Sequence, residues 1–206
     1  MPTLSLFPTR IRRTALSDQP GADAFLAELE AACRGLAEED AAGRAWSKRH
    51  GYRGYTSYAS LDDLPRRATV FGELKRRLDR EAGAFAGELG LALGGKRVKL
   101  DSLWVNVMSP GGTHSGHIHP LSVLSGTLYV GTPPGAGAIR FEDPRLPMMM
   151  ARPPVLPDAS DEQHSFFVVA PAAGDLLLWE SWLRHEVTPH RGRGERISLS
   201  FNYSWG

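Results

Sequence analysis

Apolar side chains in the first half of the chain recur at the spacing of an amphipathic helix. Between residues 21 and 46, one helical face carries Phe25, Leu26, Leu29, Ala32, Cys33 and Leu36. A second helix is predicted over about 68–92, where the apolar face carries Val70, Phe71, Leu74, Leu78, Phe85, Leu89 and Leu91 and where glycines follow to end it. Residues 4–13 are predicted as a short leading strand, and the segment 51–65, rich in tyrosine and glycine, as a loop.

From about residue 97 the apolar pattern changes to a period of two, which is typical of β-strands. Six segments show it, separated by turns rich in glycine and proline: 98–108, 124–130, 137–143, 164–171, 174–181 and 196–205. Helices followed by several short strands predict an α+β fold in which the helices brace a sandwich or barrel. We expect a single domain over residues 1–206, with a helical N-terminal support at 1–95 and a β core at 96–206.

Alternation within these strands gathers polar residues on one face. In the last strand Arg196, Ser198, Ser200 and Asn202 share a face, opposite Ile197, Leu199, Phe201 and Tyr203. Ser125, Thr127 and Tyr129 likewise share a face, and Asn106 falls between Trp104 and Met108. In an ordinary sandwich water covers such a face, which is the usual case for a single strand. Several such strands in one chain favour the alternative of a polar lumen that binds a charged ligand.

Composition and charge narrow the function classes. The chain has 206 residues, of which 42% are apolar and 23% charged, and its net charge is +1. Nucleic-acid binding is not expected, because it needs a strong basic excess on one face. Neither a membrane span nor a signal peptide is expected, because no apolar run is long enough for one. A lone cysteine, Cys33, forms no internal disulfide, which is typical of a cytoplasmic protein.

The stretch "GGTHSGHIHP" places His114, His117 and His119 within six positions. On a strand, His117 and His119 would project to one face with their Cα atoms about 6.6 Å apart, so both imidazoles could converge on one metal ion. A third ligand must then come from elsewhere in the chain. His185 is the candidate, because it lies between a strand and the Gly-rich turn that precedes Arg196.

Other residues compete for these places. The pattern H-x-x-H-x-H offers three candidates for two positions, so His114 is a rival ligand, and Glu186 beside His185 is a rival carboxylate. An H-x-H pair alone is a weak motif with many chance matches, and a lone histidine is usually a core or surface residue. The order is the stronger signal: H-x-H, a distal histidine, then Arg196 and Ser198 on one strand.

That order resembles a bacterial family of 2-oxoglutarate/iron oxygenases within the double-stranded β-helix dioxygenases. The matching motifs are Trp104-Val-Asn106, His117-Ile-His119-Pro120, Ser125-Gly126, Tyr129-Val130, Trp182 before His185, Val187, Pro189, and Arg196-Ile-Ser198 through Asn202. They run from about residue 100 to the end of the chain, and the opening "LFPTRI" is also similar to the family's start. The resemblance implies a jelly-roll core at 96–206 that carries the metal site.

The resemblance also implies the cofactors and their ligands. Fe(II) would be held by His117, His119 and His185, which leaves open positions for 2-oxoglutarate and O2. The far carboxylate of 2-oxoglutarate would meet Arg196, whose planar guanidinium suits a two-pronged contact, with help from Ser198. Tyr129, Thr127 and Asn106 are further candidates for contacts with this cosubstrate. The alternative for Arg196 is a structural ion pair with Glu195 or Glu186.

One departure from the wider superfamily keeps other functions open. Most members have a carboxylate where this chain has His119, and three neutral imidazoles make the site one unit more positive. The leading hypothesis is an Fe(II)- and 2-oxoglutarate-dependent oxygenase that hydroxylates an unidentified small molecule or peptide. One alternative is a three-histidine, cupin-like dioxygenase that needs no 2-oxoglutarate. Another is a non-catalytic, metal-stabilised binding protein.

The segment "LPMMMARPPVLPD", residues 146–158, is interpreted as a long loop between strands. Methionine side chains adapt to varied partners, so this loop could serve as a mobile lid or as a contact in a homodimer. Simple packing of the loop on the core is an equally good interpretation of the same pattern.

Overall fold

The structure is a computed structural model that describes residues 3–206. Its helices are α1 (Ala22–Glu39), α2 (Ala41–Arg49), α3 (Leu64–Arg67) and α4 (Thr69–Glu88), with short 3-10 turns at Leu16–Asp18, Leu146–Met148 and Asp161–Gln163. Its strands are β1 (Ile11–Ala15), β2 (Gly54–Thr56), β3 (Val98–Met108), β4 (His114–His117), β5 (Leu124–Gly131), β6 (Ile139–Glu142), β7 (Phe166–Val169), β8 (Asp175–Glu180), β9 (His185–Val187) and β10 (Arg196–Trp205).

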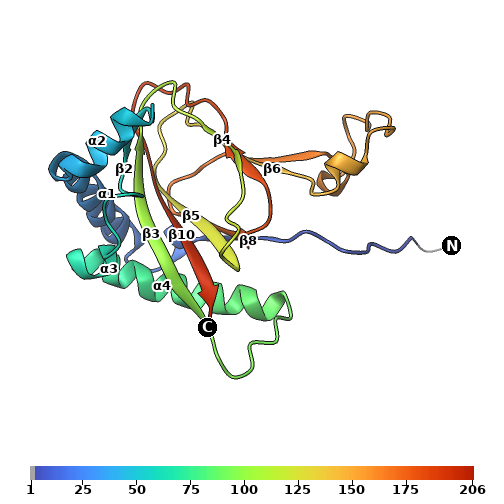
Figure 1. Cartoon of the computed structure of the whole chain (residues 1–206), viewed down its shortest axis with the longest axis horizontal. Helices are drawn as coiled ribbons and strands as arrows, with labels where there is room; N and C mark the ends of the chain where they lie inside the picture. Colours follow the sequence, from blue (N-terminus) through green and yellow to red (C-terminus); the bar gives the residue numbers. More distant parts are fainter. Residues whose placement is uncertain (1–2) are drawn as a thin grey trace.

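The strands form two antiparallel sheets that face each other (Figure 1). The large sheet has the order β1-β8-β5-β10-β3-β2, and the small sheet has the order β4-β9-β6-β7. The first half of the chain therefore supplies both edges of the large sheet, β1 and β2, in addition to the helices. This arrangement confirms the predicted α+β fold with a jelly-roll core.

The helices cover the outer face of the large sheet (Figure 1). The apolar stripes of α1 and α4 bury Leu29, Leu74 and Leu78 completely, against strand residues such as Val105 and Leu199. A fully buried leucine contributes about 1.5–3 kcal/mol relative to an exposed one, so this layer holds the helices on the sheet. Among the described helices, none combines the length and hydropathy that crossing a membrane requires.

Strand β10 shows why the two sides of the large sheet differ. Its odd-numbered residues Ile197, Leu199 and Phe201 are fully buried in the helix-facing core. Its even-numbered residues, from Arg196 to Asn202, line a cavity on the opposite side. The period-two pattern of the sequence predicted this division, and the polar face is turned to a lumen rather than to bulk water.

Several element boundaries differ from the sequence-based expectation. The predicted helix over 21–46 is two helices, because Asp40 lies outside helical geometry between α1 and α2 and caps the latter. The leading strand occupies Ile11–Ala15 rather than 4–13, since its partner β8 begins at Asp175, opposite Ala15. Strands β2, β4 and β9 were not predicted, because segments of three or four residues are too short to show alternation.

The carboxylate of Asp40 joins α2 to the following chain. It accepts hydrogen bonds from the backbone N–H of Gly43 (2.9 Å), the hydroxyl of Tyr55 (2.9 Å) and the hydroxyl of Ser60 (2.5 Å). Burial opposes ionisation of Asp40, but these hydrogen bonds outweigh it, so the pKa of Asp40 lies below its usual value.

We expect Asp40→Ala to lower the free energy of unfolding by about 2 kcal/mol at pH 7, the upper range for a lost helix N-cap. Because the folded pKa is depressed, the contribution is complete above the ordinary carboxyl pKa of 3.8 and is lost as the pH falls through the folded value. Urea unfolding at pH 7 and near pH 3 measures both effects. A difference between wild type and variant that stays constant over this range would contradict the assignment.

Candidate functional site

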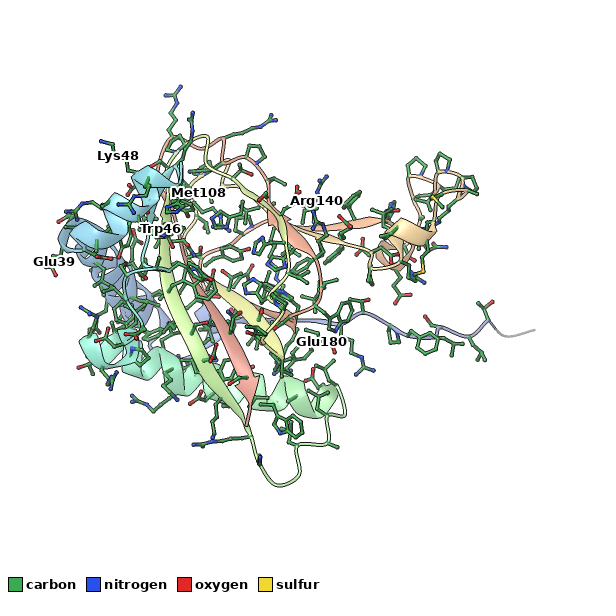
Figure 2. All side chains as sticks on the ribbon, viewed as in Figure 1. Glu39, Trp46, Lys48, Met108, Arg140 and Glu180 are labelled. Carbon is green, nitrogen blue, oxygen red and sulfur yellow. The ribbon has the colours of Figure 1, made fainter. Side chains whose placement is uncertain are left out.

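A cavity of about 930 Å³ lies between the two sheets. Its floor is the polar face of β3, β5 and β10, and histidines from the β4 and β9 side lie across from that floor. Figure 2 shows side chains filling the space between β3 and β6, with Trp46 of α2 on the β3 side and Arg140 of β6 on the other. A site with two different walls can bind a ligand that needs contacts from both sheets.

Three histidines meet at this cavity. One nitrogen of each of His117, His119 and His185 lies within 4.8 Å of the corresponding nitrogens of the other two. The ring centroids are 4.5 Å apart for His117 and His185, 5.1 Å for His117 and His119, and 5.3 Å for His119 and His185. The structure therefore brings together the three residues that the sequence predicted as a metal-binding set.

Backbone carbonyls orient two of these rings. Nδ1 of His117 lies 2.8 Å from the carbonyl oxygen of Ser115, and Nδ1 of His185 lies 2.9 Å from that of Leu183. A carbonyl only accepts hydrogen bonds, so Nδ1 carries the proton in both rings and Nε2 keeps its lone pair. Such a partner on the second nitrogen is the usual companion of a metal-binding histidine.

His119 reaches the cluster by a route that the sequence reasoning did not foresee. Strand β4 ends at His117, so His117 and His119 do not share one face of a continuous strand. Instead, the backbone N–H of His119 donates to the carbonyl of Ser181 at 2.9 Å, which holds this residue beside the turn that follows β8. Its Nε2 is buried without a hydrogen-bond partner among the described residues, as expected for an atom reserved for a ligand.

His114 lies outside the cluster. The pairing of β4 with β9 shifts register between His114 and His117, and the His114 ring stands 6.4 Å from that of His117. Its nearer aromatic neighbour is Tyr52, at 5.2 Å. The positive charge of Arg196 is close enough to contribute to lowering the pKa of His114.

Burial keeps these imidazoles neutral. It lowers the pKa of His119 to about 4 and that of His185 to about 3, and neighbouring histidines contribute further in both cases. Burial also lowers the pKa of His114 to about 4, with the charge of Arg196 as the second cause. Neutral imidazole is the form that binds metal, so His119 and His185 are already in their binding state near neutral pH.

Arg196 is a buried cation that has no counterion among residues 3–206. It is 3% exposed, and its guanidinium donates to the carbonyl of Gly137 (3.0 Å) and the hydroxyl of Ser198 (3.1 Å). The guanidinium also lies 4.9 Å from the ring centroid of Tyr129. Burying an unpaired charge is costly, so this arrangement indicates a place for an anion.

The alternative ion pairs for Arg196 are not formed. Glu195 pairs with Arg34 at 2.7 Å, and Glu186 pairs with Arg140 at 2.9 Å. Within residues 3–206, Arg196 makes no contact of this kind with a carboxylate. Glu186 is equally absent from the histidine cluster, so the rival carboxylate does not join these three residues.

The remaining predicted cosubstrate residues also line the cavity. Tyr129 lies beneath Arg196, and its hydroxyl is buried without a hydrogen-bond partner among the described residues. Asn106 is less free, because its amide accepts from Thr56 (2.9 Å) and donates to Ser200 (3.1 Å). Thr127 is buried in the floor.

Sequence reasoning missed Tyr52. Its hydroxyl is buried without a partner among the described residues, and burial raises its pKa while the charge of Arg196 opposes that change. Two unpaired phenol donors, Tyr52 and Tyr129, thus lie near one unpaired arginine. The signal in the sequence was the segment "GYRGYTSY", whose tyrosines were interpreted only as loop residues.

The donor set is appropriate for the expected metal and cosubstrate. Three imidazoles on one side of a cavity suit a first-row metal ion such as Fe(II) and leave its other positions open. An arginine, a serine hydroxyl and two phenols near the same cavity suit a carboxylate. The cavity therefore offers ligands both for a metal ion and for a carboxylate.

Comparisons with known proteins agree with this geometry. Residues 102–202 match a family model described as "Putative 2OG-Fe(II) oxygenase". No curated protein sequence matches the chain. Among solved structures, a prolyl-4-hydroxylase from Pseudomonas putida is similar, with a TM-score of 0.63, 21% identity, and coverage of 96% of this chain and 94% of that one.

Two proteins from Streptomyces share the same fold. HygX from Streptomyces hygroscopicus, solved with nickel and 2-oxoglutarate bound, has a TM-score of 0.59 and 15% identity over 95% of this chain and 82% of its own. AviO1 from Streptomyces viridochromogenes has a TM-score of 0.60 and 15% identity over 95% and 90%, respectively. These solved structures show that the fold is shared. The family match confirms the resemblance seen in the sequence: residues 102–202 belong to the 2OG-Fe(II) oxygenase family, whose cofactor is Fe(II) and whose cosubstrate is 2-oxoglutarate.

Proposed function

We propose that His117, His119 and His185 hold Fe(II), and that Arg196 with Ser198 holds the far carboxylate of 2-oxoglutarate. The observation that carries the proposal is the pairing of two unusual features in one cavity: a cluster of three histidines and a buried arginine that contacts no carboxylate within residues 3–206. Burying the unpaired arginine is costly by itself, and the histidine cluster by itself does not identify a ligand. Together they match the two ends of a metal-chelating dicarboxylate.

The bound iron and cosubstrate supply the redox chemistry. In the overall reaction, one atom of O2 enters a substrate C–H bond as a hydroxyl group, and the other enters succinate as 2-oxoglutarate loses CO2. The protein contributes positions and charges. The carbonyls of Ser115 and Leu183 fix the His117 and His185 rings, and the Arg196 charge fixes the cosubstrate's distal end.

Tyr52 and Tyr129 complete the proposed carboxylate site. Both hydroxyls can donate hydrogen bonds, and burial keeps both phenols protonated because it raises their pKa values. A carboxylate between them and Arg196 would satisfy donors that have no partner in the protein itself. The cost of leaving these groups buried is thereby offset when the cosubstrate binds.

A cytoplasmic location and an unidentified small-molecule or peptide substrate are also proposed. The buried, unpaired Cys33 is consistent with a reducing compartment. The homodimer and the single-domain organisation remain predictions. The exposed side chains of Met148 and Met150, between β6 and β7, are where an oligomer contact was expected.

We expect His117→Ala and His185→Ala to abolish retention of iron after anaerobic reconstitution, because each removes one of three oriented nitrogen ligands. Metal content measured by atomic emission on the purified variants tests this. His164→Ala is the matched control, since that histidine lies outside the cavity and bonds to the carbonyl of Ala159. Stoichiometric iron in both His117→Ala and His185→Ala would place the metal elsewhere.

We expect Arg196→Leu to weaken 2-oxoglutarate binding by about 2–5 kcal/mol, the range for truncating one partner of a buried charge pair. Iron retention should be unchanged, because Arg196 does not belong to the histidine cluster. Calorimetric titration of 2-oxoglutarate into anaerobic, metal-loaded protein measures the loss. Arg140→Leu, at an arginine already paired with Glu186, is the control.

An unaltered 2-oxoglutarate affinity in Arg196→Leu would favour the three-histidine, cupin-like dioxygenase instead. That alternative has one observation on its side, since the cluster contains three imidazoles and no carboxylate within residues 3–206. The two functions therefore differ at Arg196 and not at the metal.

We expect His119→Asp to retain iron, because aspartate restores the two-histidine, one-carboxylate set that non-haem Fe(II) accepts. His119→Ala should bind iron poorly, because the cluster then offers only two ligands. Comparing iron dissociation constants of the two variants tests the role of this residue. Equal, wild-type affinity in His119→Ala would remove His119 from the ligand set and leave His114 as the remaining candidate from the histidine-rich stretch.

A further inference from the structure

Beside the proposed metal site, the cavity has an aromatic wall formed by Trp46, Tyr58 and Trp104. Trp104 begins the wall next to the histidine cluster, where its ring lies 6.1 Å from that of His119 and only 25° from parallel. Tyr58 follows at 5.3 Å from Trp104, and Trp46 follows at 6.4 Å from Tyr58. The rings thus lead outward from the cluster in an unbroken series.

The aromatic wall lines the cavity and is partly exposed, so it is available for contact with a ligand. Its three members come from different elements: Trp46 from α2, Tyr58 from the segment after β2, and Trp104 from β3. Tyr58 is 60% exposed although it packs against the buried Trp104. An aromatic ring held in the open beside a cavity retains apolar surface that a ligand can cover.

Two exposed apolar side chains also line the cavity near His119. Ile118 and Leu121, on either side of His119 and Pro120, line the same cavity and are 44% and 95% exposed. A ligand on the aromatic wall therefore has further apolar surface available in the same cavity. The rings of the aromatic wall favour a flat aromatic ligand in particular, because aromatic rings attract one another when stacked or edge to face.

The charged residues at the cavity argue against an anionic ligand on the aromatic wall. Within residues 3–206, Arg196 is the only lysine or arginine that lines the cavity, and the cosubstrate occupies it in the proposed function. The aromatic wall therefore offers an anion no cation of its own.

We infer that the primary substrate presents an aromatic ring system without an anionic group to Trp46, Tyr58 and Trp104. This inference rests on the proposed function, because it takes the inner end of the cavity to be filled by iron and 2-oxoglutarate. A ring bound on the wall then lies next to His119, with its C–H bonds or substituents directed to the metal site. The cavity volume of about 930 Å³ leaves space for a substrate of more than one ring beside the cosubstrate.

The test uses 2-naphthol as a neutral aromatic probe and decahydro-2-naphthol as its saturated counterpart. Calorimetric titration into the metal-free protein should show 2-naphthol binding more tightly than the saturated alcohol. Tyr58→Ala and Trp46→Ala should each weaken 2-naphthol binding by about three- to tenfold, the value of one aromatic pair. Tyr58→Phe, which keeps the ring, should bind as the wild type does.

Trp205→Ala is the matched control, because Trp205 is 56% exposed and does not line the cavity. Its 2-naphthol affinity should be unchanged. Equal binding of the two alcohols, no binding of 2-naphthol, or an unaltered dissociation constant in Tyr58→Ala would overturn the inference. The titration needs neither iron nor 2-oxoglutarate, so its failure is separate from a failure of iron retention, which would overturn the proposed function.

Discussion

The two-sidedness of β10 is the constraint on which the rest of the structure depends. This strand lies between β5 and β3 at the centre of the large sheet, so both of its edges are hydrogen-bonded. Its alternate side chains must face either the helices or the cavity. A slip of one residue would drive Arg196 into the apolar layer and turn Ile197 to the cavity. The apolar residues on its other face therefore keep the proposed anion-binding residues in place.

The small sheet contributes a different kind of order. Its histidines lie on strands of three or four residues and on the chain after them, where alternation cannot position a side chain. Individual hydrogen bonds do so instead: two ring-to-carbonyl contacts, and the bond from the His119 N–H to Ser181. Desolvation also lowers the pKa values of His119 and His185, which keeps these two rings uncharged. The metal side of the cavity thus depends on local polar contacts, and the carboxylate side on sheet packing.

This difference explains what the sequence could predict. The strand pattern from residue 97, the polar face of β10 and the meeting of His117, His119 and His185 were all foreseen, because period-two alternation and motif order carry that information. The break at Asp40 was not, since the helical apolar spacing continues through it. Tyr52 and the aromatic wall were missed for a related reason. Their side chains come from a loop, a helix and a strand that only tertiary folding brings to one cavity, and no local pattern records it.

The two sheets contribute to opposite ends of the proposed cosubstrate site, with His117 and His185 on strands of the small sheet and Arg196 on the large one. A dicarboxylate bound at both ends would connect the two sheets through its contacts. Separation of the sheets and release of the cosubstrate then become linked equilibria, so occupancy stabilises the fold by mass action. The cellular concentration of 2-oxoglutarate would in that case affect the lifetime of the folded protein as well as its catalytic rate.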